Sequence, residues 1–163
     1  MTTDPAAMVL LKEGLTSFDA AKMIKDLLDK NWDTEVSSKP KLWYAEDSKF
    51  VTFRSGDQVV IYIVSEKEDP VTIGYDFVNH TAVVTLDFYT TNGTREHLVK
   101  LIEEARRIIL AHRVDSLGTD TNISGRVWMK WGVRIASFDK TTKMFRRRAI
   151  DIEINWRFRE VVA

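Results

Sequence analysis

The stretch Ala149-Ile150-Asp151-Ile152-Glu153-Ile154-Asn155-Trp156-Arg157-Phe158-Arg159 is the most regular pattern in the 163-residue sequence. Apolar side chains occupy its even-numbered positions from Ile150 to Phe158, and mostly polar side chains stand between them. Successive side chains of a β-strand point to opposite faces of its sheet. The pattern therefore predicts a long strand with one face in an apolar core and the other face polar.

Other segments show strand patterns of the same kind. Thr81–Thr90 and Val127–Ile135 alternate, with Val127, Met129, Trp131, Val133 and Ile135 expected on one face of the second segment. Lys49–Arg54 and Gln58–Ser65 predict a hairpin, because Ser55-Gly56-Asp57 is a strong turn signal. A short strand over Leu42–Ala45 is a further candidate.

Two segments have the spacing of amphipathic helices. The first runs over Ser17–Asn31, with Ser17 as the expected N-cap. The second runs over Thr94–Arg113, with Glu96–Lys100 and Glu103–Arg107 as expected ion pairs on its wet face. Its expected buried stripe is Leu98, Leu101, Ile102, Ala105, Ile108 and Ile109.

Together these segments predict an α+β fold, a mainly antiparallel sheet of about five strands with two principal helices, in the order α-β-β-β-α-β-β. Residues 1–163 are expected to form a single domain, with 1–14 as an N-terminal arm or short helix and 15–160 as the core. A short helical turn is expected at Pro5–Lys12. Polar loops are expected at Glu66–Asn79 and Val114–Gly125.

Composition excludes several classes of protein. The 24 basic and 24 acidic residues balance, which disfavours a dedicated nucleic-acid binder and favours association. The absence of cysteine excludes disulfides, thiolate chemistry and cysteine-type zinc sites. No apolar stretch approaches the roughly 20 residues of a membrane-spanning helix. The short apolar run Ala6–Leu11 lacks a basic region before it, so no signal peptide is expected.

Catalytic and cofactor motifs are missing from the sequence, so neither an enzyme nor a cofactor is predicted. His80, His97 and His112 lack second ligands at metal-binding spacing, and no glycine-rich phosphate loop is present. One alternative is a metal-dependent nuclease built on Asp151 and Glu153. Lys130 and Arg134 on the neighbouring strand explain these acids as partners in cross-strand ion pairs.

Arg146, Arg147 and Arg148 form one basic cluster, with Trp128 nearby as an outward-facing aromatic residue. Basic and aromatic side chains together bind single-stranded nucleic acid through phosphate contacts and stacking. A nucleic-acid or protein interaction module is therefore a second alternative, with direct contact to nucleic acid open but not favoured.

The sheet is expected to carry apolar and ionic side chains on both faces, whereas two helices cover one face. The second face therefore has the character of a subunit or partner interface. The residues expected there are Tyr62, Tyr89, Trp128, Lys130, Arg134, Arg146, Arg147, Arg148, Asp151, Glu153, Arg157 and Arg159.

The chain resembles the tail-terminator, or tail-completion, proteins of tailed viruses over residues 15–160. The carriers are Thr85-Leu86-Asp87-Phe88-Tyr89 followed by Arg95-Glu96-His97-Leu98-Val99-Lys100-Leu101-Ile102, and the closing strand Arg148–Arg157. The resemblance implies a structural virion protein of the tail and neck, assembled in the host cytoplasm. It also implies a homo-oligomeric ring, commonly a hexamer, that ends the tail tube and joins it to neck or connector proteins.

Overall fold

The computed structural model describes residues 19–44, 56–70, 77–91, 94–115, 123–142 and 145–159. Within these ranges lie helices α2 (Ala20–Asn31) and α3 (Arg95–Ala111). The strands are β1 (Lys41–Tyr44), β2 (Asp57–Pro70), β3 (Phe77–Thr90), β4 (Val114–Asp115), β5 (Ile123–Thr142) and β6 (Phe145–Arg159). The predicted α+β class and its element order are confirmed, with β4 as a two-residue addition.

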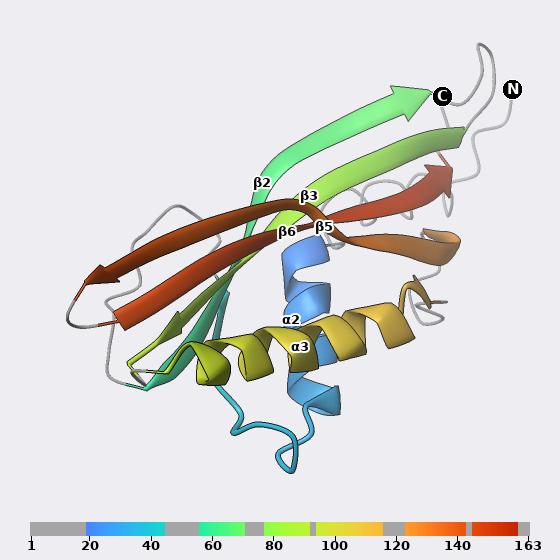
Figure 1. Ribbon diagram of the computed structural model, residues 1–163. Coiled ribbons are helices and arrows are strands. Elements are labelled where there is room, and N and C mark those ends of the chain that lie inside the picture. The colour runs from blue at the N-terminus through green and yellow to red at the C-terminus, as the bar shows by residue number, and fades with distance from the viewer. Residues whose placement is uncertain are drawn as a thin grey trace, which may run out of the picture.

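The strands form one sheet in the order β1-β2-β3-β6-β5-β4. β1 pairs parallel with β2, and every other neighbouring pair is antiparallel. Both helices lie on the same side of this sheet and cross one another beneath it (Figure 1). The described elements thus form two layers, strands above and helices below.

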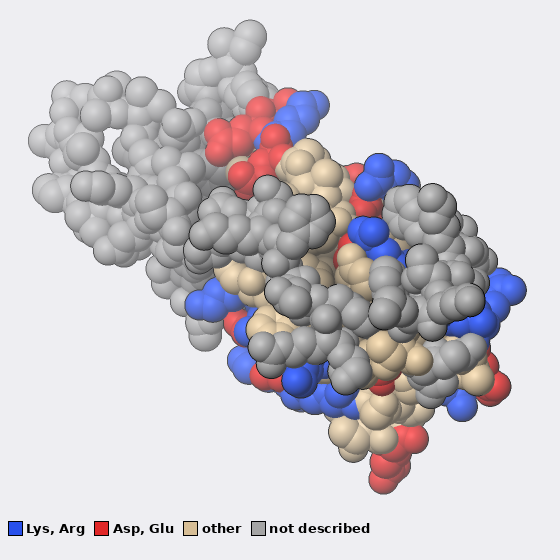
Figure 2. Space-filling model, turned by 90° about the vertical axis from the view of Figure 1, so that its left-hand side faces the viewer, with Lys and Arg blue, Asp and Glu red and all other residues tan. Residues whose placement is uncertain are grey.

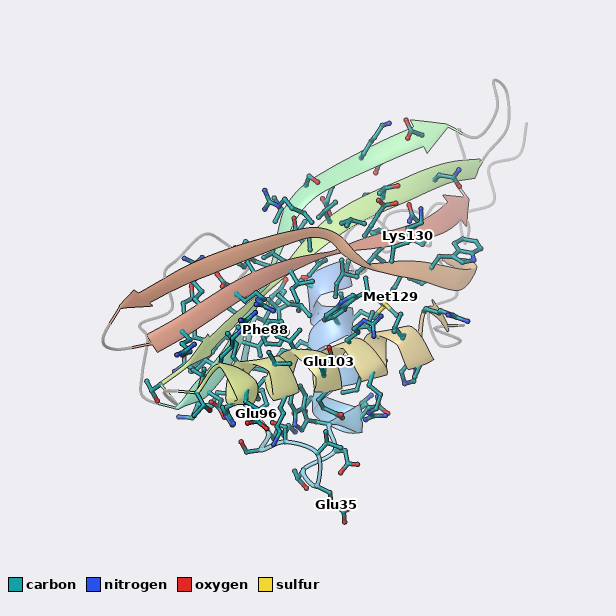
Figure 3. The ribbon with its side chains drawn as sticks, viewed as in Figure 1. Glu35, Phe88, Glu96, Glu103, Met129 and Lys130 are labelled. Atoms are coloured by element: carbon teal, nitrogen blue, oxygen red, sulfur yellow. The ribbon has the colours of Figure 1, made fainter. Side chains whose placement is uncertain are left out.

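The core lies between the sheet and the helices. Ala82, Val84, Leu86 and Phe88 of β3 are fully buried, as their alternation predicts. Figure 3 shows Phe88 and Met129 on the helix side of the sheet. The predicted stripe of α3 is buried over its whole length, as are Ile150, Ile152, Ile154 and Trp156 of β6.

The first helix begins later than expected. Asp19 is its N-cap, and its Oδ1 accepts hydrogen bonds from the backbone N–H groups of Ala21 at 3.0 Å and Lys22 at 3.2 Å. The N-cap assignment to Ser17 is therefore wrong. An aspartate carboxylate satisfies the free N–H groups of a first turn as well as a serine does, so the sequence offered two competing caps.

The described parts of the two segments expected as polar loops are strand, whereas residues 71–76 and 116–122 lie outside the described residues. β2 continues through Glu66 to Pro70, β3 already begins at Phe77, and β4 and β5 take both ends of Val114–Gly125. These stretches lack alternation because the strand ends extend beyond the helices, so neither face is forced to be apolar. The expected strand Lys49–Arg54, the turn at Pro5–Lys12 and the whole of 1–14 lie outside the described residues.

A β-bulge in β5 moves Val133 out of the core. Trp131 pairs with Ile152 and Arg134 with Asp151, so Gly132 and Val133 are two extra residues on β5. Gly132 has a φ of +74°, a left-handed conformation that glycine adopts without strain. Val133 is exposed, so the prediction that it faces inward is wrong.

Arg107 of α3 also has a different partner from the one expected. Its Nε donates to Glu104 at 3.0 Å and its Nη2 donates to the carbonyl oxygen of Asn31 at 3.1 Å. Glu104 is buried, and it also accepts a 3.0 Å hydrogen bond from the backbone N–H of Asp33. The Glu103–Arg107 prediction is wrong because Glu104 and Arg107 together tie α3 to the end of α2. The expected pair Glu96–Lys100 is present at 3.6 Å.

Candidate functional site

The face of the sheet opposite the helices carries a continuous band of polar side chains, which we call the open face. Its members come from β2, β3, β5 and β6, at positions that alternate with the core residues. Strand register decides which of them meet, because residues directly opposite in neighbouring strands have close side chains. Three groups result, centred on Asp87, Asp151 and Glu153.

Asp87 of β3 is the centre of the first group. Arg147 of β6 donates two hydrogen bonds to it, from Nε to Oδ1 at 2.9 Å and from Nη2 to Oδ2 at 2.6 Å. The Tyr89 hydroxyl donates to the same carboxylate at 3.0 Å, and the guanidinium carbon of Arg147 lies 5.2 Å from the Tyr89 ring centre. Asp87 is buried although it lies on the side of the sheet away from α2 and α3.

Asp151 of β6 is the centre of the second group. Thr85, its direct partner on β3, donates to Oδ1 at 2.7 Å. Arg134, its direct partner on β5, donates from Nε to Oδ2 at 2.8 Å. Asp151 is buried as well, so each buried carboxylate on this face has an arginine and a hydroxyl as hydrogen-bond donors.

Glu153 and Asn155 extend the band along β6. Lys130 lies opposite Glu153 with Nζ 3.8 Å from Oε1, and the Asn155 amide donates to the same oxygen at 3.0 Å. Thr81 of β3 donates to the Asn155 side-chain oxygen at 2.7 Å. The expected cross-strand ion pairs of Lys130 and Arg134 with the acids of β6 are confirmed.

Three groups on this face have shifted pKa values. Burial, followed by the charge of Asp87, raises the pKa of Tyr62 and of Tyr89 above their ordinary value. The hydrogen bonds to Asp87 raise the pKa of the Arg147 guanidinium. At neutral pH both tyrosines are neutral and Arg147 is charged, so the tyrosine hydroxyls and the guanidinium act as hydrogen-bond donors.

The predicted site residues do not all come together. Tyr62, Tyr89, Lys130, Arg134, Arg147, Asp151 and Glu153 lie on the open face, and Trp128 lies opposite Asn155 with its side chain exposed. Arg146 and Arg148 alternate with Arg147 and so belong to the other side of β6. The Arg146–Arg148 cluster is therefore split between two faces, and Arg147 is engaged with Asp87. Arg157 and Arg159 are described by backbone alone, paired with Asn79 and Phe77.

Asp87 and Thr85 are members of this site that were not predicted as interface residues. Their signal in the sequence is that Thr85 and Asp87 are polar and alternate with the apolar core residues, in step with Tyr89. Position alone could not show that Arg147 reaches Asp87, because the register between β3 and β6 links residues about 60 positions apart.

The histidines lie away from the open face. His80 stacks on Trp156 with ring centres 4.2 Å apart and has Nδ1 3.3 Å from Glu68. His97 Nε2 lies 2.7 Å from Asp57, whose other oxygen accepts a 2.6 Å hydrogen bond from Thr90. His112 ends α3, with its backbone N–H bonded to Ile108. Within the described ranges, no three His, Cys, Asp or Glu side chains are grouped so that they could hold a metal ion.

Charge on the surface is mixed in sign. On the side of the molecule drawn in Figure 2, basic and acidic side chains lie interspersed over the described part rather than gathered by sign. Neither α2 nor α3 is long and apolar enough to cross a membrane. No protein-family model matches this chain, and comparison with curated proteins gives no match.

Proposed function

We propose that this protein is a structural subunit that assembles with copies of itself through the open face. The observation that carries the proposal is the pairing of Asp87 with Arg147 and of Asp151 with Arg134 on a face that neither α2 nor α3 covers. A charge without a partner is costly to cover with another protein, whereas a compensated pair is far less so. Another subunit can therefore cover this face without burying an unpaired charge.

Apolar side chains on the same part of the sheet support the proposal. Trp128 is exposed beside the ionic groups, and Val133 is exposed on the β5 bulge. Protein interfaces combine such aromatic and apolar anchors with satisfied polar groups around them. Asp87 and Asp151, each bound by several hydrogen-bond donors, are satisfied polar groups of this kind.

Within this class, we propose the role of the tail-terminator proteins that the sequence resembles. The subunits would form a ring, with six copies as the expected number, that ends the tail tube of a virion and joins it to neck or connector proteins. No catalytic step is assigned to any residue. The alternating sequences of β3 and β6 and the order of the helices and strands support this role.

Electron microscopy of the purified full-length chain, alone and mixed with candidate tail-tube subunits, tests this proposal. We expect closed rings that cap the ends of tubes and stop further growth. Particles of monomer size at every concentration, with no attachment to tubes, would overturn the assembly role. Rings that form but do not bind to tubes would overturn the proposed role in the tail and leave the self-assembly proposal standing. The same samples probed with single-stranded and double-stranded DNA test the nucleic-acid alternative, which predicts salt-dependent binding.

A further inference from the structure

The loop that follows α2 forms a fixed, acidic projection, which we call the tip (residues 33–36). The Asp33 backbone N–H donates to the buried Glu104 at 3.0 Å. The Asp33 side chain accepts from the Glu35 N–H at 2.9 Å, and the Asp33 carbonyl accepts from the Val36 N–H at 3.2 Å. Trp32 is buried and donates from its indole to the Ser37 carbonyl at 3.0 Å. Both ends of the tip are therefore anchored.

The tip exposes one apolar and two acidic side chains. Val36 is 49% exposed, and Asp33 and Glu35 are exposed beside it. A turn held in one geometry by its own hydrogen bonds loses little conformational entropy when a partner binds it. An exposed valine next to two carboxylates on such a turn has the composition of a docking element.

Two exposed cations lie on β5, in a surface that consists of Trp128, Lys130, Val133 and Arg134 and that we call the strip. The side chains of Lys130 and Arg134 are 68% and 65% exposed despite their contacts with Glu153 and Asp151. Trp128 is 40% and Val133 47% exposed. Among the described residues, four large hydrophobic side chains are exposed, and three of them belong to the tip or the strip.

We propose that the tip of one copy binds the strip of the next copy. Val36 would contact Trp128 and Val133, while Asp33 and Glu35 would pair with Lys130 and Arg134. The two surfaces lie far apart in the molecule, with Glu35 below the helices and Lys130 among the strands in Figure 3. Such a contact joins unlike surfaces, so it repeats head to tail and closes into a ring when the rotation per copy permits.

This inference rests on the proposed self-assembly and names the surfaces that carry it. It also gives the buried Glu104 a role, since Glu104 holds Asp33 and thus the start of the tip. Charge complementarity favours a second copy as the occupant, because two carboxylates on one surface meet two cations on the other.

Site-directed cross-linking tests the contact cleanly because the chain has no cysteine. The double variant Val36→Cys/Val133→Cys, treated with a short bis-maleimide, is expected to give a ladder of covalent oligomers. Each single variant is expected to stay uncross-linked, because a head-to-tail contact does not bring like surfaces together. A mixture of the two single variants is expected to stop at dimers. Covalent dimers from either single variant, or no ladder from the double variant, would overturn the proposal.

Charge exchange separates this inference from the proposed function. Glu35→Lys and Lys130→Glu are each expected to raise the concentration needed for assembly about tenfold or more, and the double exchange is expected to restore it. Glu103→Lys on the wet face of α3 makes the same charge change away from both surfaces and is the matched control. If the wild-type chain assembles and neither variant differs from the control, the tip–strip contact is wrong while assembly stands. If the wild-type chain never assembles, both proposals fail.

Discussion

Arg147 of β6 holds Asp87 of β3 through two hydrogen bonds of 2.9 and 2.6 Å on the sheet face that lies away from both helices. Two parallel bonds between a guanidinium and a carboxylate fix both side chains in one geometry. Tyr89 completes the arrangement with a bond to Asp87 and its ring beside Arg147. This pair joins two central strands and neutralises the charge of the buried Asp87 carboxylate.

Breaking this pair should destabilise the fold. Arg147→Ala leaves the carboxylate of Asp87 buried without its cation, and we expect a loss of about 2–4 kcal/mol in the free energy of unfolding. This expected loss is smaller than the roughly 3–5 kcal/mol typical of a fully buried ion pair, because the Arg147 side chain is about one-third exposed to solvent. Urea denaturation measures it.

The exposed pair Lys67–Asp69, 3.1 Å apart on β2, supplies the matched control. Lys67→Ala should cost less than about 0.5 kcal/mol, since solvent-exposed pairs contribute little. A loss for Arg147→Ala no larger than that of the control would show that the open-face pair does not hold the strands.

Tyrosine titration reports on the environment of Asp87. The raised pKa of Tyr62 and of Tyr89 in the folded chain means that the neutral side chain is favoured there. The stability they contribute is present below the unfolded pKa of about 10 and is lost as the pH rises through the folded value. Ultraviolet difference absorbance should therefore show a late-ionising group among the four tyrosines.

The substitution Tyr89→Phe should remove part of that late ionisation and cost about 1 kcal/mol at neutral pH, the net value of one hydrogen bond. If every tyrosine of the folded wild-type chain ionised near its ordinary pKa, the burial of Tyr89 against Asp87 would be contradicted.

Glu104 should make the fold sensitive to acid. The hydrogen bond from Arg107 lowers the pKa of Glu104 in the folded chain. Its contribution to stability is then complete above the unfolded pKa of about 4.3 and is lost as the pH falls through the lower, folded value. Glu104→Gln should cost about 2 kcal/mol at neutral pH, and the difference from wild type should shrink in acid.

The neighbouring Glu103 is exposed and makes a direct control for Glu104. Glu103→Gln should change the unfolding free energy by less than about 0.5 kcal/mol at any pH. A Glu104→Gln loss that stayed constant down to strongly acidic pH would show that the charge of Glu104 is not what stabilises the α2–α3 junction.

The bulge in β5 gives a contrast between two adjacent residues. Gly132→Ala puts a side chain at a φ of +74° and should cost about 1–2 kcal/mol. Val133→Ala should cost less than about 0.5 kcal/mol because Val133 is exposed. Thermal or urea unfolding of both variants measures the difference, and a large loss for Val133→Ala would place that residue back in the core.

Much of this fold could be predicted from periodicity. The alternation from Ile150 to Trp156 and the stripe from Leu98 to Ile109 exist because each element buries one face. Burial of one face requires apolar residues at regular spacing, and this spacing is visible in the sequence. The same logic placed Lys130 and Arg134 opposite the acids of β6. It also fixed the α+β class, since two amphipathic helices and an alternating sheet must cover one another.

What periodicity could not predict depends on local departures from it and on contacts distant in sequence. Val133 breaks its pattern because a bulge adds two residues, and no hydrophobic count shows where a bulge lies. Arg107 binds Glu104 and not Glu103. Glu104 also accepts a hydrogen bond from the backbone N–H of Asp33, which follows α2, and this contact is distant in sequence. The strand end near Glu66 was not predicted because its side chains are exposed and its composition is that of a loop.

The most direct test of the central claim is the mass of the assembled chain, measured by light scattering or sedimentation over a wide concentration range. We expect a single species at a fixed multiple of the monomer mass, six copies being the expected number, and a shift toward monomer in a Trp128→Ala variant that keeps its fold. A wild-type chain that remains monomeric at the highest concentration would contradict the account of the open face as an assembly surface.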